Sequence, residues 1–419
     1  MSSSLSNFEA RSIIETLRSG VPSRNIGRIF ATARQELLDQ ISDRLDGTVF
    51  APGGMVLLGK YGEGKTHLLN TVFAMARKKN MVVSMATLSK ETPMDKLYHI
   101  YTRLMANTYL PERSQPGIGH LFEKLGPEDP IAKDLLLYAG EALQIDKLYY
   151  LLKALLNTEV EEERFELLSD LEGNLHSFGS VKTMYRRISQ EPASSAMRFV
   201  KSRHMMDYFN FMSFFFRSLG YSRWVLLFDE AELIGQLGKK ARINAYANMA
   251  KLLANGNSNI FSLFVFNASY RSEVIEGKHE VENLIEQQPP HQDQAEIERI
   301  IDLISGAPQL ATVSDAELLI VVEQIRLFHG QAYAWNPAVE TELLLASSDV
   351  RKPLRTRIRI AVEMLDQLYL YGHTGSISIS DLVETAYTEE IPYPEELEQL
   401  GDEEEEQTIP QSMGVLGSR

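Results

Sequence analysis

The most informative segment of the chain is Gly59-Lys-Tyr-Gly-Glu-Gly-Lys65-Thr66, which matches the pattern G-x-x-x-x-G-K-[ST] in full. Its glycines permit backbone conformations that turn successive N–H groups inward and form a binding site for anions. Lys65 would supply a positive charge to the β- and γ-phosphates of a nucleotide, and the Thr66 hydroxyl can bind Mg²⁺. We therefore predict a phosphate-binding loop (a Walker A motif) formed by Gly59, Gly62, Gly64, Lys65 and Thr66.

The residues on both sides of this loop provide the structural context that the motif requires. The run Met55-Val-Leu-Leu58 is short and apolar, lies between glycines, and is typical of a buried strand. Helical sequence begins at Thr66, so the positive end of a helix dipole would point at the same phosphates. A strand that leads through the loop into a helix is the arrangement in which this motif binds phosphate.

A second apolar run ends in paired acids and would complete the site. In Trp224-Val-Leu-Leu-Phe-Asp229-Glu230, the buried strand predicted at 224–228 is followed directly by two carboxylates. We expect Asp229 to contact Mg²⁺, directly or through water, and Glu230 to orient and deprotonate the water that attacks the γ-phosphate. This role for Glu230 predicts hydrolysis of the nucleotide and not storage alone.

Two further polar residues are candidates for the same site. Asn267 follows the apolar segment 260–266, where its side chain would hold the attacking water; the alternative is a strand-end asparagine that makes a turn. Arg355 opens an amphipathic helix near the C-terminus, from which it would reach the γ-phosphate, with Arg351 as second choice. A solvated basic helix face remains the alternative for these arginines.

Strands that alternate with helices, followed by a helical region, predict an α/β fold with a parallel sheet, a large helical insertion and a C-terminal helical lid. We divide the chain into an N-terminal helical segment, the first half of the core, the insertion, the second half of the core, the lid and an acidic disordered tail. Their residue ranges are 1–45, 46–110, 111–220, 221–288, 289–388 and 389–419.

Composition excludes several classes of site. The chain has no cysteine, which rules out disulfides, thiolate metal sites and cysteine nucleophiles. The net charge is −15, but residues 389–419 hold ten acidic residues and one basic residue, which leaves −6 on residues 1–388. The sequence shows neither a signal peptide nor an apolar run long enough to span a bilayer, so we expect a cytoplasmic protein that does not act at a membrane.

A basic island interrupts the acidic body. Residues 182–203 contain a single acid, Glu191, and six basic residues: Lys182, Arg186, Arg187, Arg198, Lys201 and Arg203. The island is compatible with contacts to a DNA backbone, with docking to an acidic protein surface, or with a solvated face. The aromatic-rich segment 208–216 that follows is better explained by packing against the sheet than by base stacking.

Together these motifs resemble an AAA+ P-loop ATPase, and more closely the BREX-system ATP-binding proteins of the BrxC/BrxD type from bacterial phage defence. The resemblance rests on residues 10–24, 59–66, 219–232, 247–253 and 354–366. It implies ATP and Mg²⁺ as ligands, with Lys65, Thr66, Asp229 and Glu230 in the nucleotide and hydrolysis roles, and it places Arg24 near the base or ribose. AAA+ sites usually form between subunits, which implies a homo-oligomer with an arginine supplied by the neighbour; Arg242 and Arg271 are candidates.

The resemblance therefore leads us to expect an oligomeric, Mg²⁺-dependent ATPase of antiphage defence that acts as a switch or motor on DNA or on a partner protein. Two alternatives stay open. In the first, the chain has no motor activity and is an ATP-dependent scaffold that recruits a helicase, nuclease or methyltransferase. In the second, the chain is an origin-type initiator or helicase loader that binds DNA.

Overall fold

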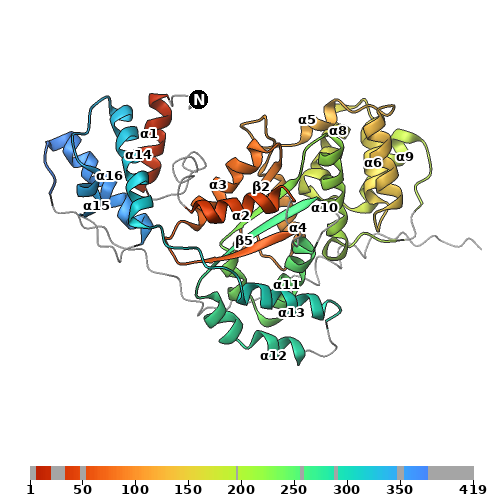
Figure 1. Cartoon of the computed structure of the whole chain (residues 1–419). Coiled ribbons are helices and arrows are strands. Elements are labelled where there is room, and N and C mark those ends of the chain that lie inside the picture. Colours follow the sequence, from red (N-terminus) through yellow and green to blue (C-terminus); the bar gives the residue numbers. More distant parts are fainter. Residues whose placement is uncertain are drawn as a thin grey trace, which may run out of the picture.

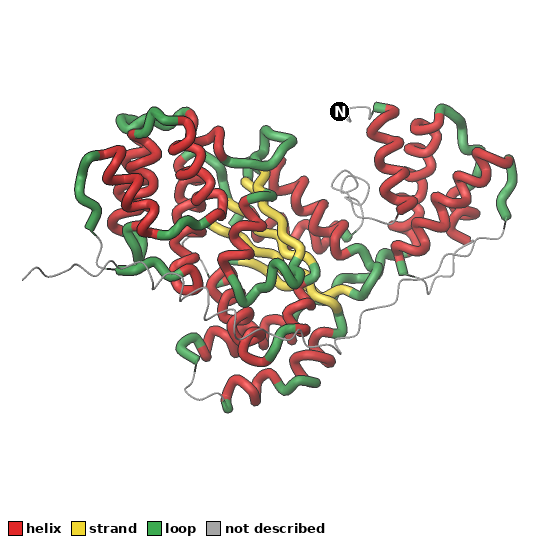
Figure 2. The backbone as a smooth tube through the Cα atoms, turned by 180° about the vertical axis from the view of Figure 1, so that it is seen from behind, coloured by secondary structure: helices red, strands yellow, loops and turns green. Residues whose placement is uncertain are grey.

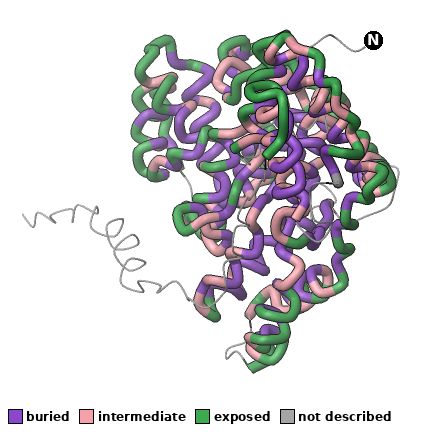
Figure 3. Tube along the Cα trace, turned by 90° about the vertical axis from the view of Figure 1, so that its left-hand side faces the viewer, coloured by how far each residue is buried: buried purple, intermediate pink, exposed green. Residues whose placement is uncertain are grey.

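The structure is a computed structural model that describes residues 6–19, 34–47, 53–194, 197–254, 259–286, 291–346 and 353–375. Arg24, Arg351 and the acidic segment 389–419 lie outside these described residues. A sheet with its covering helices forms the centre of the molecule, one group of helices extends from it on the right of Figure 1, and a second group lies at the left. Figure 3 shows buried residues running through the middle of the molecule.

The sheet is mainly parallel, as predicted. Its strand order is β1-β5-β4-β2-β3, and all neighbouring pairs are parallel except β2 and β3. The strands are β1 Gly54–Gly59, β2 Val82–Thr87, β3 Thr108–Tyr109, β4 Trp224–Asp229 and β5 Ile260–Asn267. The predicted phosphate loop and the predicted acid pair therefore lie at the ends of two parallel strands that are separated by β5, at the same edge of the sheet. Figure 2 shows the strands of the sheet side by side in the centre of the molecule.

Both faces of the sheet are covered by helices, which explains why its central strands are apolar throughout. Every residue of β1, β4 and β5 is buried. Leu57 packs with α2 and α3 on one face, whereas its neighbours Val56 and Leu58 belong to the core on the other face. The helices on the two faces are α2 Gln35–Leu45, α3 Lys65–Lys78, α4 Leu97–Met105, α10 Lys201–Ser218, α11 Lys239–Leu253 and α13 Gln294–Ser305. Helix α12 Glu280–Ile285 packs on α13. Short helices follow β4 and β5, namely η3 Ala231–Gln236 and η4 Arg271–Glu276.

The segment between β3 and β4 is helical, as predicted. It contains α5 Gly119–Glu123, α6 Pro130–Glu141, α7 Lys147–Asn157, α8 Glu161–Ser169, the π-helix η2 Asp170–Asn174, α9 Phe178–Ser189 and α10. The aromatic residues of α10 pack as expected: the rings of Phe209 and Phe216 lie 5.7 and 5.3 Å from that of Trp224 in β4. A fully buried ion pair of 2.8 Å between Lys147 and Asp170 joins α7 to η2.

The remaining helices form a separate hydrophobic core away from the sheet. It consists of the predicted lid helices α14 Asp315–Tyr333, α15 Thr341–Ala346 and α16 Leu354–Tyr371, together with the N-terminal helix α1 Asn7–Ser19. The predicted division of the chain differs here from the packing, because α1 lies on the lid and not on the sheet domain. Likewise α13, which we assigned to the lid, packs on α11 and β1 and belongs to the sheet core.

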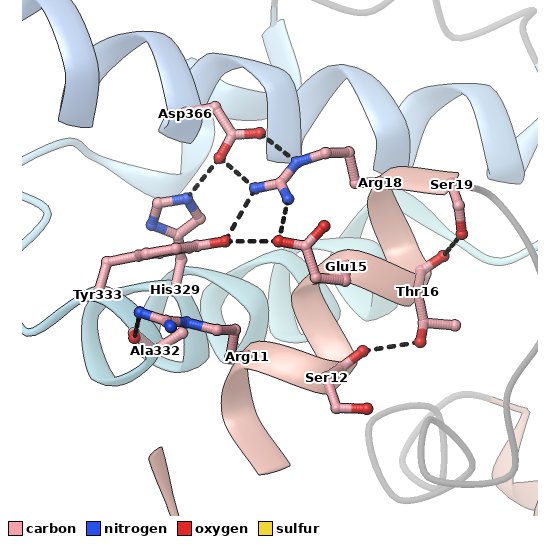
Figure 4. Close-up of polar contacts among 10 residues, drawn as sticks. All are labelled: Arg11, Ser12, Glu15, Thr16, Arg18, Ser19, His329, Ala332, Tyr333 and Asp366. Carbon is pink, nitrogen blue, oxygen red and sulfur yellow. Dashed lines mark hydrogen bonds and ion pairs between the residues drawn. The ribbon is translucent and has the colours of Figure 1, made fainter. Parts of the chain in front are cut away.

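Polar contacts fix α1 on the lid (Figure 4). Arg18 donates two hydrogen bonds to the carboxylate of Asp366, at 2.8 and 2.6 Å, and a third to the Tyr333 hydroxyl at 3.1 Å. The buried His329 lies 3.0 Å from the same carboxylate through Nε2, and its Nδ1 accepts from the Trp335 indole at 2.9 Å. Because an indole N–H only donates, Nδ1 must carry a lone pair, and Nε2–H therefore donates to Asp366.

Candidate nucleotide site

The glycines of the predicted phosphate loop adopt the conformations that the motif requires. Gly62 and Gly64 have φ values of 75° and 85°, in the left-handed region where a side chain would be strained. A Cβ atom at Gly62 would also lie only 2.7 Å from Cβ of Pro353 in the segment that enters α16. The loop leads directly into α3, which begins at Lys65, so the N–H groups of its first turn are directed at the loop.

Thr66 and Asp229 are brought into direct contact although 163 residues separate them. The Thr66 hydroxyl donates to Oδ2 of Asp229 at 2.6 Å, and Oδ1 of the same carboxylate accepts from the backbone N–H of Glu230 at 3.0 Å. Burial raises the pKa of Asp229, and the hydrogen bond from Thr66 opposes that shift. The two predicted Mg²⁺ ligands therefore offer a hydroxyl and a carboxylate side by side.

Glu230 lies beside this pair in an unusual backbone conformation. Its φ of 56° is left-handed, and this geometry turns the chain from β4 into η3. The side chain lines a pocket together with Lys65 and Arg355. Burial, followed by the nearby charges of Glu232 and Asp229, raises the pKa of Glu230 to about 7. A carboxylate with this pKa is well matched to accepting a proton near neutral pH.

Lys65 is held by a residue that the sequence pattern did not single out for a role. Its ammonium group donates to Oε1 of Glu232 at 3.0 Å and to the carbonyl oxygen of Gly59 at 3.3 Å. The side chains of Lys65 and Glu232 are only 8% and 9% exposed. Burial raises the pKa of Glu232, and the positive charge of Lys65 acts in the opposite direction.

Arg355 comes to the loop from the lid. Its backbone N–H donates to the carbonyl oxygen of Gly62 at 3.1 Å, its Nη1 donates to the Tyr61 hydroxyl at 3.3 Å, and its guanidinium lies 5.5 Å from the centre of the Tyr61 ring. The first turn of α16 therefore closes the pocket opposite the phosphate loop. The pocket is lined by Tyr61, Gly62, Gly64, Lys65, Thr66, His67, Glu230, Leu354, Arg355 and Ile358.

Asn267 lies beside the loop. It ends β5 in register with Gly59, and it is 95% buried. Its Oδ1 accepts from the backbone N–H of Ser269 at 3.0 Å, which is the turn that we considered as its alternative role. The described lining of the pocket does not include Asn267, so its contact with the attacking water stays a prediction.

A family model now adds to this geometry: the model for the BREX system ATP-binding protein BrxC/D matches residues 5–125 and 167–361. These segments make up more than half of the chain. The chain belongs to the BrxC/D family of BREX system ATP-binding proteins. The resemblance predicted from the motifs is thereby confirmed, with an ATP-binding role in phage defence. No curated protein and no solved structure matches the chain.

The match to the BrxC/D family includes every residue of the pocket described above. It leaves out residues 126–166, which contain α6 and α7. Part of the helical insertion therefore lies outside the match, whereas the candidate nucleotide site and the first helices of the lid lie within it.

Besides Glu232, three residues around the BrxC/D site were not predicted. Arg34 donates to the carbonyl oxygens of Glu63 at 2.7 Å and Ala311 at 2.8 Å, and so joins the loop to the chain that leads into the lid. Its burial lowers its pKa to about 10. His67 is half-buried in the lining of the pocket, and its partial burial lowers its pKa to about 4, which keeps the imidazole neutral. Tyr61 is the third. Since none of the three belongs to a spacing pattern, only the folded structure reveals them.

The structure corrects the prediction for one of the two arginines that were candidates for completing the site of a neighbouring subunit. Arg242 is buried, forms an ion pair of 2.8 Å with Glu280 and donates to the carbonyl oxygen of Leu237 at 2.6 Å. It stabilises the chain's own core and is not available at the surface. Arg271 is 57% exposed at its side chain, where it pairs with Glu276 at 2.9 Å. It remains the candidate.

The basic island lies at the end of α9, in the connection to α10 and at the start of α10. Five of its six basic residues are exposed: Arg186, Arg187, Arg198, Lys201 and Arg203. Arg187 forms an ion pair of 2.8 Å with Glu163, and the exposed Arg186 donates to the carbonyl oxygen of Ala193 at 3.0 Å. The half-buried Lys182 lies 4.3 Å from the Phe178 ring. Part of the island therefore also stabilises the insertion.

The residues of the site fit the two ligands that the fold family implies. The positive φ values of Gly62 and Gly64 and the start of α3 suit a phosphate chain, and the adjoining oxygens of Thr66 and Asp229 suit Mg²⁺. Within the described residues no group of three or more His, Asp or Glu side chains is arranged to hold a metal ion by itself. In the same part of the chain, no helix has the length and apolar character to cross a membrane.

Proposed function

We propose that this BrxC/D-family protein is a Mg²⁺-dependent ATPase with an AAA+ core, which acts in antiphage defence as an oligomeric switch or motor on DNA or a partner protein. The proposal rests above all on the contact of 2.6 Å between Thr66 and Asp229. This contact brings the end of the phosphate loop together with the carboxylate that ends β4, and it leaves Glu230 beside both. A site built only to hold nucleotide has no need of Glu230.

The AAA+ assignment is supported by the arrangement around the site. β5 lies between the strand of the loop and the strand of the acid pair, so that Asn267 ends beside Gly59. A helix of the lid brings Arg355 to the opposite side of the pocket. The phosphate loop, Glu230 and the lid arginine at one pocket, with Asn267 beside the loop, support this assignment.

Each residue has a defined part in the proposed reaction. Lys65 and the first N–H groups of α3 bind the phosphates, and Thr66 and Asp229 hold the metal ion. When bound, Mg²⁺ neutralises part of the negative charge of the phosphates. Glu230 accepts a proton from water, and Arg355 adds positive charge from the lid side.

The metal role is tested by Asp229→Asn, which keeps the size of the side chain but removes its charge. We expect the Mg²⁺ concentration for half-maximal ATP turnover to rise about tenfold, since loss of one ligand or of its support typically weakens a metal site to this extent. Asp302→Asn, which changes an exposed aspartate of α13, is the matched control. A Mg²⁺ requirement that is equal in both variants would show that Asp229 does not hold the metal ion.

We further propose that DNA is one partner and contacts the exposed part of the basic island. Arg198, Lys201 and Arg203 lie close together in sequence where the chain enters α10, and all three are exposed. Three exposed positive charges, on a body whose net charge is only mildly negative, favour contact with the phosphate backbone of DNA. In this proposal the insertion binds DNA and transmits the effect of binding to the ATPase core, so that DNA stimulates ATP hydrolysis.

Charge reversal tests this surface. Arg198→Glu combined with Lys201→Glu is expected to weaken DNA binding at least about tenfold at low salt, and to reduce the slope of log K against log salt by about 2. Lys239→Glu combined with Lys240→Glu is the matched control, because both lysines are exposed at the start of α11. If the two double variants bind DNA equally, the island is not the DNA contact. Binding that is tight but independent of ATP would argue against an origin-type initiator.

A further inference from the structure

A third acid, Glu232, contacts the phosphate loop through Lys65. Glu232 belongs to η3, two residues after the proposed general base Glu230. Its Oε1 holds the Lys65 ammonium at 3.0 Å, and it is absent from the lining of the pocket into which Lys65 and Glu230 face. Its other oxygen, Oε2, is buried and accepts no hydrogen bond from the described part of the chain. Glu232 therefore depends on Lys65 for neutralisation of its charge.

A buried ion pair of this kind is difficult to break. Removing one partner leaves a charge in a region of low polarity, with neither water nor a counter-ion to stabilise it. Both side chains of the pair are more than 90% buried. Any ligand that draws the Lys65 ammonium toward the pocket must compensate for the carboxylate that is left behind.

The contacts of the Lys65 ammonium show which groups a phosphate must compete with. An ammonium group has three donors, and two of them are directed at Glu232 and at the carbonyl oxygen of Gly59. Three carboxylates, those of Asp229, Glu230 and Glu232, surround the site, and two cations, Lys65 and Arg355, oppose them. Phosphate groups entering the pocket thus compete with Glu232 for the charge of Lys65.

We propose that Glu232 is a positioning residue that competes with nucleotide phosphates for the ammonium group of Lys65 and thereby limits nucleotide affinity. The inference rests on the proposed function, because it takes Lys65 as the phosphate-binding lysine. Without nucleotide, the pair neutralises Lys65 and stabilises the fold. When nucleotide binds, the Lys65 ammonium is shared between Glu232 and the phosphates or moves to the phosphates. The free-energy cost of leaving the buried Glu232 carboxylate without its counter-ion weakens nucleotide binding.

The test compares Glu232→Gln with the wild-type chain by calorimetric titration of ADP in the presence of Mg²⁺. Glutamine has the size of glutamate but no charge, so Lys65 is released to the phosphates. We expect the dissociation constant of ADP to fall about tenfold, corresponding to about 1.4 kcal/mol. Glu232→Asp retains the charge on a shorter side chain and is expected to give an intermediate affinity. Glu91→Gln, at an exposed glutamate in the loop after β2, is the matched control and should bind ADP as the wild type does.

A second measurement is independent of nucleotide. Without ligand, Glu232→Gln should lower the melting temperature because Lys65 loses its counter-ion, and the double variant Lys65→Met, Glu232→Gln should recover part of that loss. Unchanged or weaker ADP binding by a folded Glu232→Gln variant would overturn the competition. If the wild-type chain itself failed to bind ADP, or bound it as well as Lys65→Ala does, the proposed function would fail instead.

Discussion

Lys65→Ala is expected to abolish nucleotide binding, with the affinity for ATP falling at least about 100-fold. The variant removes the only lysine of the loop that lines the pocket, and with it the charge-assisted hydrogen bonds to the phosphates. Binding of ATP in the presence of Mg²⁺, measured by calorimetry, reads this out directly. Lys60→Ala provides the matched control, because Lys60 belongs to the same loop but is exposed.

The same variant should also destabilise the ligand-free protein, because Glu232 then loses the one cation that lies at hydrogen-bonding distance from it within the described residues. Lys65→Met combined with Glu232→Gln removes both charges and keeps the fold available for the binding measurement. If this folded double variant still bound ATP with wild-type affinity, the phosphate loop would not be the nucleotide site.

Glu230→Gln is expected to reduce ATP hydrolysis about 1000-fold while ATP binding and assembly are retained, because glutamine cannot accept the proton of the attacking water. The side chain keeps its size at the pocket wall, where it lies beside Lys65 and Arg355. Turnover is measured as phosphate release, and ATP binding by calorimetry. Glu91→Gln again serves as the exposed control.

Phage protection by the same Glu230→Gln variant separates a motor from a scaffold. A motor or switch driven by hydrolysis predicts that protection is lost although the protein still binds ATP and assembles. A scaffold that recruits a helicase, nuclease or methyltransferase through ATP binding alone predicts unchanged protection. Lys65→Ala should abolish protection in either case, so it is the reference for complete loss.

The sequence alone was sufficient for those parts of the site that rest on local patterns. The glycines and Lys65 stand within eight residues, and Asp229 follows a strand whose apolar run shows burial on both faces. Parallel strands end at one edge of a sheet, so these residues were expected to meet, and the contact between Thr66 and Asp229 shows that they do.

The remaining features depend on packing between distant segments and leave no local pattern. The N-terminal helix is amphipathic, but amphipathicity does not say which surface it will cover, and Arg18 finds its partner Asp366 348 residues away. In the same way, a basic residue in a helix is compatible with a solvent-facing or a buried position. Arg242 is buried because Glu280 neutralises it, a pairing that only the tertiary structure reveals.

Glu232 shows the limit most clearly. In the sequence it only extends the acidic run that begins with Asp229 and Glu230. In the structure Glu232 lies in η3 outside the lining of the pocket, where it accepts a hydrogen bond from Lys65. A short helix of 3₁₀ type decides which way each acid points, and its course was not encoded in any spacing that we recognised.

Phosphate release from ATP by the purified wild-type chain, measured with Mg²⁺ and again with Mg²⁺ removed by a chelator, tests the central claim most directly. Our account predicts steady release that requires Mg²⁺ and falls to background in Glu230→Gln measured alongside. Release that continues without Mg²⁺, or an equal rate in wild type and Glu230→Gln, would contradict the assignment of Thr66, Asp229 and Glu230 to a hydrolytic site.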